Sequence, residues 1–105
     1  MTHEFDFSSA TSYKWENEMY EYNFVKAKKA IAFLMRVFKL RGYLYLNQVY
    51  ERFGIEWNPD NENILIRYNE CYINEDSPLF HLYDDDNGEY VRIMIDAYYD
   101  ETMSK

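Results

Sequence analysis

The sequence predicts a small single-domain protein of the α+β class, with a long N-terminal helix and a short second helix on an antiparallel sheet of about three strands. Apolar residues follow a helical period in the first part of the chain and strand-like runs follow, and an Asn-Gly pair separates the last two runs. The length of 105 residues fits one ordinary domain, and 48% hydrophobic residues provide enough apolar material for a core.

Residues 1–11 are expected to form a polar leader, and residues 12–105 the folded domain. The leader contains Phe5 and Phe7, so it could be loose or could pack as a short arm.

A long helix is predicted from about residue 12 to about residue 40. Thr11 or Ser12 suits its N-cap, and Gly42 suits its end, with cationic residues in the last turn. Asn23 could divide it into two helices. The apolar stripe, with residues mostly three or four apart, consists of Trp15, Met19, Tyr22, Phe24, Ala27, Ile31, Leu34 and Phe38.

A short second helix is predicted over residues 48–53. Asn47 is a suitable N-cap and Gly54 a suitable end. The residues expected to share its apolar face are Leu46, Val49, Tyr50 and Phe53.

Strand signals dominate the rest of the chain. Residues 55–57 precede a turn at 58–61, residues 64–73 read as a strand, and residues 74–78 as another turn. We expect the long helix to cover one face of the sheet.

The clearest local signal is a hairpin of residues 79–83 and 90–98. Asn87-Gly88 is the preferred pair for a two-residue type I′ turn. That turn places Leu82 opposite Ile93, and the apolar residues then share one face. The other face is expected to hold His81, Tyr83, Tyr90, Arg92, Met94 and Asp96.

Charge is distributed unevenly along the chain, whose net charge is −8. Residues 1–42 contain seven Lys/Arg and five Asp/Glu, whereas residues 43–105 contain four Lys/Arg and fourteen Asp/Glu. An acidic surface repels nucleic acid and attracts basic partners, although it also simply increases solubility. The cations of the long helix fit its solvent face, so we expect no direct binding of nucleic acid.

Other functional classes find little support in the sequence. The acidic turn at Asp84–Glu89 does not have EF-hand spacing, and no cysteine-histidine metal motif or phosphate-binding glycine loop is present. We therefore expect no cofactor, no metal and no enzymatic activity. The single cysteine, Cys71, favours a reducing compartment, and no apolar run is long enough to span a membrane. We expect a cytoplasmic protein without a membrane partner.

Tyrosine is unusually frequent, with twelve residues, several of which alternate with acidic residues. Tyrosine supplies rigid contact area. Spaced carboxylates can pair with the Arg and Lys residues of a partner in the way that the phosphates of a nucleic-acid backbone do. An ordinary polar sheet edge would look similar. The residues expected to bind a partner are Tyr83, Asp84, Asp85, Asp86, Glu89 and Tyr90, with Glu70, Glu75 and Asp76 adding to the field.

The run from Arg41 to Ile55 resembles a motif of small uncharacterised proteins of phages and mobile elements in Gram-positive bacteria. Their pattern is a glycine, an alternating apolar stretch and Leu-Asn-x-Val-Tyr-x-x-Leu-Gly. Phe53 replaces the second Leu here, and the later part of the pattern is not clearly present. The residues that match are Gly42, Leu46, Asn47, Val49, Tyr50 and Gly54. The resemblance supplies no chemistry but implies a phage-encoded accessory protein.

These observations lead to two hypotheses. The first is an acidic inhibitor of a basic, nucleic-acid-handling host protein, which acts as a DNA mimic or against host defence. Its basis includes an analogy with small, acidic, tyrosine-rich phage proteins. The alternative is a phage structural or assembly protein that forms a homo-oligomer through its aromatic surface.

Overall fold

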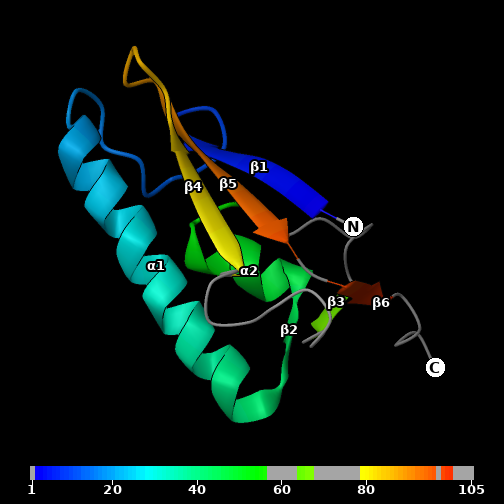
Figure 1. The fold of residues 1–105 in the computed structure, drawn as a ribbon. Helices are drawn as coiled ribbons and strands as arrows, with labels where there is room; N and C mark the ends of the chain where they lie inside the picture. Colours follow the sequence, from blue (N-terminus) through cyan, green and yellow to red (C-terminus); the bar gives the residue numbers. More distant parts are fainter. Residues whose placement is uncertain (1, 57–63, 68–78, 97, 101–105) are drawn as a thin grey trace.

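The computed structural model describes residues 2–56, 64–67, 79–96 and 98–100, and it has the α+β fold that the sequence predicts (Figure 1). Its elements are β1 (Thr2–Ser8), α1 (Tyr20–Arg41), β2 (Tyr43–Tyr45), α2 (Leu46–Arg52), β3 (Leu65–Arg67), β4 (Phe80–Asp84), β5 (Tyr90–Asp96) and β6 (Tyr98–Asp100).

The main sheet has the strand order β1-β5-β4 and is antiparallel throughout. The predicted hairpin register is confirmed, because Leu82 lies opposite Ile93 and Phe80 opposite Ile95. The third strand is β1, so the expectation that residues 1–11 form a leader is wrong for residues 2–8. β1 pairs with β5 along its whole length.

The alternation of residue types explains why residues 2–8 form a strand. Phe5 and Phe7 lie opposite Ile93 and Val91, on the face that packs into the core. Glu4 and Asp6, which alternate with these two residues, fall on the other face because successive side chains of a strand point to opposite faces. Phe7 is 1% exposed. The first strand is therefore part of the core structure.

A second small sheet has the order β2-β3-β6. In it, Leu44 lies opposite Ile66, and both side chains are buried. The strand predicted over 64–73 is described only at β3. Residues 68–73, the two predicted turns at 58–61 and 74–78, and the end of the short run at 55–57 lie outside the described residues. Ile55 forms an isolated bridge with Ser12.

The long helix α1 begins at Tyr20, so the predicted start near residue 12 is wrong. Asn23 explains the difference: its side chain bonds to the backbone of Glu16, so the preceding segment folds back against the helix as a loop. Asn23 lies within α1 and does not break it. The helix ends at Gly42 as predicted, where the Gly42 N–H donates to the Phe38 carbonyl at 2.7 Å and Gly42 has a φ of 83°.

The buried face of α1 differs in part from the predicted stripe. Met19 and Tyr22 are half exposed, at 50% and 49%. Met19 precedes the helix, and Tyr22 lies in its first turn but off the buried face. The buried residues of α1 are Asn23, Ala27, Ala30, Leu34 and Phe38.

The second helix α2 begins at Leu46, one residue before the predicted cap. Asn47 is buried inside the first turn, and the Gln48 side chain accepts a hydrogen bond from the Tyr45 N–H at 2.9 Å. Of the predicted apolar face, Leu46, Val49 and Phe53 are buried. Together with α1 and the main sheet, this face forms one hydrophobic core (Figure 1).

Candidate protein-binding surface

The tip of the β4–β5 hairpin consists of residues 85–89. The Gly88 N–H donates to the Asp85 carbonyl at 3.0 Å, and the Glu89 N–H donates to the Asp85 carboxylate at 2.9 Å. Gly88 has a φ of 71°, whereas Glu18 is the one described non-glycine residue with a positive φ. A type I′ turn needs positive φ at both central residues, Asn87 and Gly88. The predicted turn type is therefore wrong, although the register that it implied is present.

The hairpin tip lies against the start of α1 (Figure 1). A Cβ added at Gly88 would lie 3.4 Å from the Tyr20 side chain. Tyr20 packs edge-on to Trp15, with ring centroids 6.3 Å apart, and Trp15 packs edge-on to Phe7 at 5.2 Å. A row of aromatic rings therefore connects the core to the hairpin tip, and it positions the acidic turn beside the loop that precedes α1.

The tip presents carboxylates to solvent. Asp86 and Glu89 are exposed, and Asp85 is partly exposed while its carboxylate holds the turn. For Asp84 the structure describes only the backbone, at the end of β4. Two of the four predicted acidic residues of the turn are therefore free to bind a partner without breaking the turn.

A shallow groove of about 680 Å³ adjoins the tip. Three carboxylate residues from three separate segments line it, namely Asp6 of β1, Glu18 of the loop and Glu89 of the hairpin. No Lys or Arg lines the groove among the residues that the structure describes. Trp15 and Tyr90 supply aromatic surface. The groove is therefore concave, acidic and partly aromatic.

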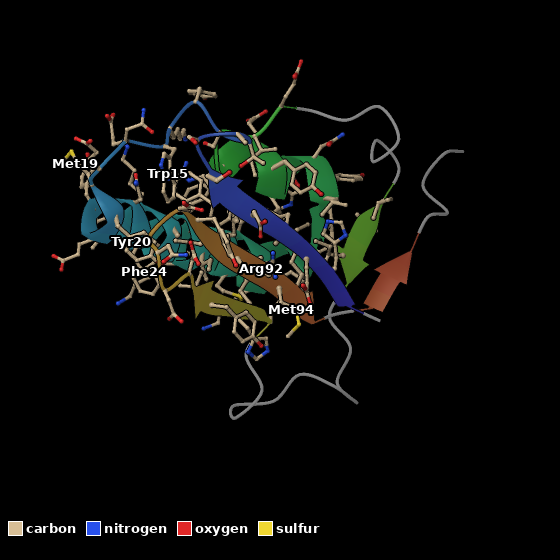
Figure 2. All side chains as sticks on the ribbon, turned by 90° about the horizontal axis from the view of Figure 1, so that it is seen from above. Trp15, Met19, Tyr20, Phe24, Arg92 and Met94 are labelled. Atoms are coloured by element: carbon tan, nitrogen blue, oxygen red, sulfur yellow. The ribbon has the colours of Figure 1, made fainter. Side chains whose placement is uncertain are left out.

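The outer face of the main sheet continues from this groove and contains the predicted side chains of the hairpin. Tyr83 is 48% exposed, and Tyr90, Arg92 and Met94 are partly exposed. Figure 2 shows Arg92 and Met94 on β5 next to β1, with Tyr20 at the start of α1 and Trp15 in the loop before it.

Arg92 makes this face less uniformly acidic than the sequence suggested. Its guanidinium donates to both carboxylate oxygens of Asp6, at 2.8 and 3.3 Å, and lies 5.1 Å from the centre of the Tyr90 ring. The hydrogen bond with Asp6 raises the pKa of Arg92 above its ordinary value. The pair neutralises the centre of the outer face, so the unneutralised acidic surface is at the hairpin end.

Some of the residues predicted to bind a partner lie close together in the structure, and others lie outside the described residues. Tyr83, Asp85, Asp86, Glu89 and Tyr90 come together at one end of the sheet. The three residues expected to strengthen the field, Glu70, Glu75 and Asp76, lie outside the described residues.

Sequence reasoning missed two groove residues, Asp6 and Glu18. Asp6 was missed because residues 1–11 were taken as a leader. The alternation of charged and aromatic residues from Glu4 to Phe7 was a signal for a strand that could have found it. Glu18 was assigned to the helix, and no local signal marked the loop.

Other chemistry has no assembled site in the described part of the chain. No group of three or more His, Cys, Asp or Glu residues that could hold a metal ion occurs in the part of the chain that the structure describes. No helix within the described ranges is long and apolar enough to cross a membrane. Cys71 lies outside those ranges. His3 bonds to Tyr50, with 2.7 Å between His3 Nε2 and the Tyr50 hydroxyl, and burial lowers the pKa of His3.

Comparisons with known proteins provide no relative: no family model matches the chain, and no curated protein or solved structure matches it significantly. The resemblance of residues 41–55 to phage proteins therefore stays a prediction.

Proposed function

We propose that this protein is a phage-type accessory protein that binds a basic, nucleic-acid-handling host protein in the cytoplasm and inhibits it. In this proposal the hairpin tip and the adjoining groove occupy a basic surface that the partner would otherwise use for nucleic acid.

One observation carries the proposal. Exposed carboxylates of the hairpin tip stand beside a groove into which two further segments contribute Asp6 and Glu18, with no cation in its lining among the described residues. Arg92 already pairs with Asp6, whereas Glu18, Asp86 and Glu89 form no ion pair with a described residue. These unpaired like charges repel each other, and a cationic partner would relieve that repulsion. Arginine and lysine of such a partner would form charge-assisted hydrogen bonds with these carboxylates.

The aromatic residues of the same surface support protein binding over simple solubility. Tyr83 and Tyr90 lie on the outer face beside the tip, and Trp15 lines the groove. Aromatic side chains that can be buried on association commonly contribute most to interface affinity. A surface that only kept the protein soluble would not need exposed rings among its carboxylates.

The test is an affinity pull-down from a bacterial lysate at low salt, eluted with a salt gradient and analysed by mass spectrometry. We expect a basic nucleic-acid-binding protein to elute at moderate salt because screening weakens charge pairing. A purified partner should then lose binding to DNA or RNA when this protein is added. Normal nucleic-acid binding by the partner in the complex would refute inhibition.

Charge-reversal variants make the test specific to the tip. Glu89→Lys reverses a carboxylate in the groove, and Glu56→Lys reverses an exposed carboxylate outside the groove lining with the same change in net charge. We expect Glu89→Lys to weaken binding at least about tenfold, as loss of a charge-assisted hydrogen bond implies. Equal losses in both variants would mean that net charge alone, and not the tip, drives binding.

The alternative function is a phage structural or assembly protein that forms a homo-oligomer. Tyr13 and Leu40 favour it, because they are large apolar residues that are 83% and 82% exposed. It predicts association that persists at high salt and is lost in the Leu40→Gln variant. A monomer in sedimentation velocity at high protein concentration would reject this alternative.

A further inference from the structure

A second concave surface, with the opposite charge, lies between α1, α2 and the loop before α1. A pocket of about 310 Å³ opens there. Its lining consists of Phe7, Lys14, Lys26, Lys29, Ala30, Arg52 and Phe53. Four of these seven residues are cations and none is a carboxylate. From the sequence, Lys26 and Lys29 were expected on a solvated helix face, and no local pattern joins them to Lys14 and Arg52.

Backbone carbonyl groups hold two of these cations in place. Lys26 Nζ donates to the Lys14 carbonyl at 2.6 Å, and Lys14 Nζ donates to the Arg52 carbonyl at 3.2 Å. A carbonyl oxygen orients an ammonium group without neutralising its charge, and each ammonium has three donors, so donors remain. Glu16 approaches Lys26 Nζ at 3.9 Å. Lys29 is exposed and has no hydrogen bond or ion pair with a described residue.

An adjoining pocket of about 370 Å³ shares Lys14 and Arg52 with the first. Its lining includes the aromatic residues Tyr13 and Phe33, of which Tyr13 is 83% exposed, and one carboxylate residue, Glu51. The guanidinium of Arg52 lies 3.7 Å from the centre of the Phe33 ring, at the boundary between the pockets. A cationic pocket and an aromatic surface are therefore continuous.

We propose that this groove binds a nucleoside phosphate, with the phosphate in the cationic pocket and the base against Tyr13 and Phe33. Phosphate oxygens accept hydrogen bonds from Lys and Arg, and a base stacks on an aromatic ring or on a guanidinium. The two volumes lie within the range of small-molecule sites. The net charge of −8 opposes a long polyanion, whereas a short ligand meets mainly the local cations. The proposal is independent of the acidic surface.

The test uses three probes, ADP, pyrophosphate and adenosine, measured by isothermal titration calorimetry with the full chain. We expect ADP to bind most tightly, pyrophosphate to bind more weakly and lose affinity with salt, and adenosine to bind most weakly. This order follows because ADP alone fills both pockets. Absence of ADP binding at millimolar concentration, or adenosine binding as tight as that of ADP, would overturn the proposal.

Matched variants locate the site. Lys29→Gln removes a cation of the pocket, and Lys28→Gln removes the neighbouring exposed cation, whose ammonium instead lies 5.5 Å from the centre of the Phe24 ring. Both change the net charge equally, and neither residue bonds to the backbone in the way that Lys14 and Lys26 do. We expect Lys29→Gln to weaken ADP and pyrophosphate about tenfold and Lys28→Gln less than about twofold. Equal losses would overturn the proposal.

A third variant separates the two pockets. Tyr13→Leu should weaken ADP while leaving pyrophosphate unchanged, because Tyr13 lines only the second pocket, whereas Phe33 also contacts the Arg52 guanidinium of the first. If single-stranded oligonucleotides bind this groove much more tightly than ADP, the site serves nucleic acid and the small-ligand proposal fails. If ADP binds but no basic protein is captured through the hairpin tip, this proposal stands and the proposed function fails.

Discussion

The side-chain amide of Asn23 forms two hydrogen bonds with the backbone of Glu16, seven residues earlier. Its nitrogen donates to the Glu16 carbonyl at 2.8 Å, and its oxygen accepts from the Glu16 N–H at 2.9 Å. Asn23 is fully buried in the first turn of α1. The pair fixes the loop before the helix, and that loop contributes Trp15 and Glu18 to the acidic groove and Lys14 to the cationic pocket.

Asn23→Ala should lower the free energy of unfolding by about 2–3 kcal/mol, because it leaves backbone groups of Glu16 without partners. Urea denaturation measures this. Asn23→Leu should be no more stable, since it keeps the volume but forms no hydrogen bonds. Asn17→Ala, at an exposed site of the same loop, should stay within about 0.5 kcal/mol of the wild type. A stable Asn23→Leu variant would show that the hydrogen bonds contribute nothing.

Phe7→Ala should lower the free energy of unfolding by about 3–5 kcal/mol, because Phe7 is buried against the rings of Trp15 and Phe53. Phe7→Leu, which leaves a smaller gap, should cost less and keep the protein folded for comparison. Tyr83→Ala, on the outer face of the same sheet, should cost least. Thermal unfolding followed by circular dichroism gives the order. Equal effects at Phe7 and Tyr83 would mean that β1 is not part of the core structure.

His3 should make stability depend on pH. Burial lowers the pKa of His3 below 6.5, so the unfolded chain takes up a proton at His3 more readily than the folded protein does. The free energy of unfolding should therefore fall as the pH decreases through 6.5 toward the lower pKa of the folded state, with a slope of at most one proton. Above 6.5 His3 is neutral in both states and contributes no slope.

The His3→Gln variant checks this assignment in urea denaturations between about pH 5 and about pH 8. Its stability should fall less on acidification than that of the wild type. Asn17→Ala, which removes no titratable group, is the control for the effect of a substitution as such and should keep the wild-type slope. A His3→Gln variant with the same pH profile as the wild type would contradict the assignment.

Asp85 should stabilise the hairpin tip, because its carboxylate accepts the Glu89 N–H. Asp85→Ala should lower the free energy of unfolding by about 0.5–1.5 kcal/mol. Asp85→Asn, which keeps an acceptor oxygen, should cost less, and Asp86→Ala should be close to neutral. Differential scanning calorimetry distinguishes the three variants. If Asp86→Ala is as destabilising as Asp85→Ala, the hydrogen bond from the Glu89 N–H to the Asp85 carboxylate does not stabilise the tip, and the structural role assigned to Asp85 is wrong.

Local signals predicted part of the candidate surface correctly. The register of the hairpin follows from turn position and alternation, so Tyr83, Asp85 and Glu89 were assigned to one end of the sheet from sequence. The three residues belong to one hairpin, so their relative positions follow from residues that are close together in the chain. The turn type did not follow from Asn87-Gly88, because the Asp85 side chain and the contact with Tyr20 favour another conformation.

Local sequence patterns were enough to predict the fold class, the end of α1 at Gly42 and the pairing of β4 with β5. Each depends on residues close together in the chain, whose propensities act before any distant contact forms. The start of α1, the pairing of β1 with β5 and the set of residues that line each groove depend on contacts between distant parts of the chain. Arg92 and Asp6, for example, are 86 positions apart and meet because β1 adds to the edge of the hairpin. Such contacts form only when the whole core packs, and no single stretch of sequence specifies them.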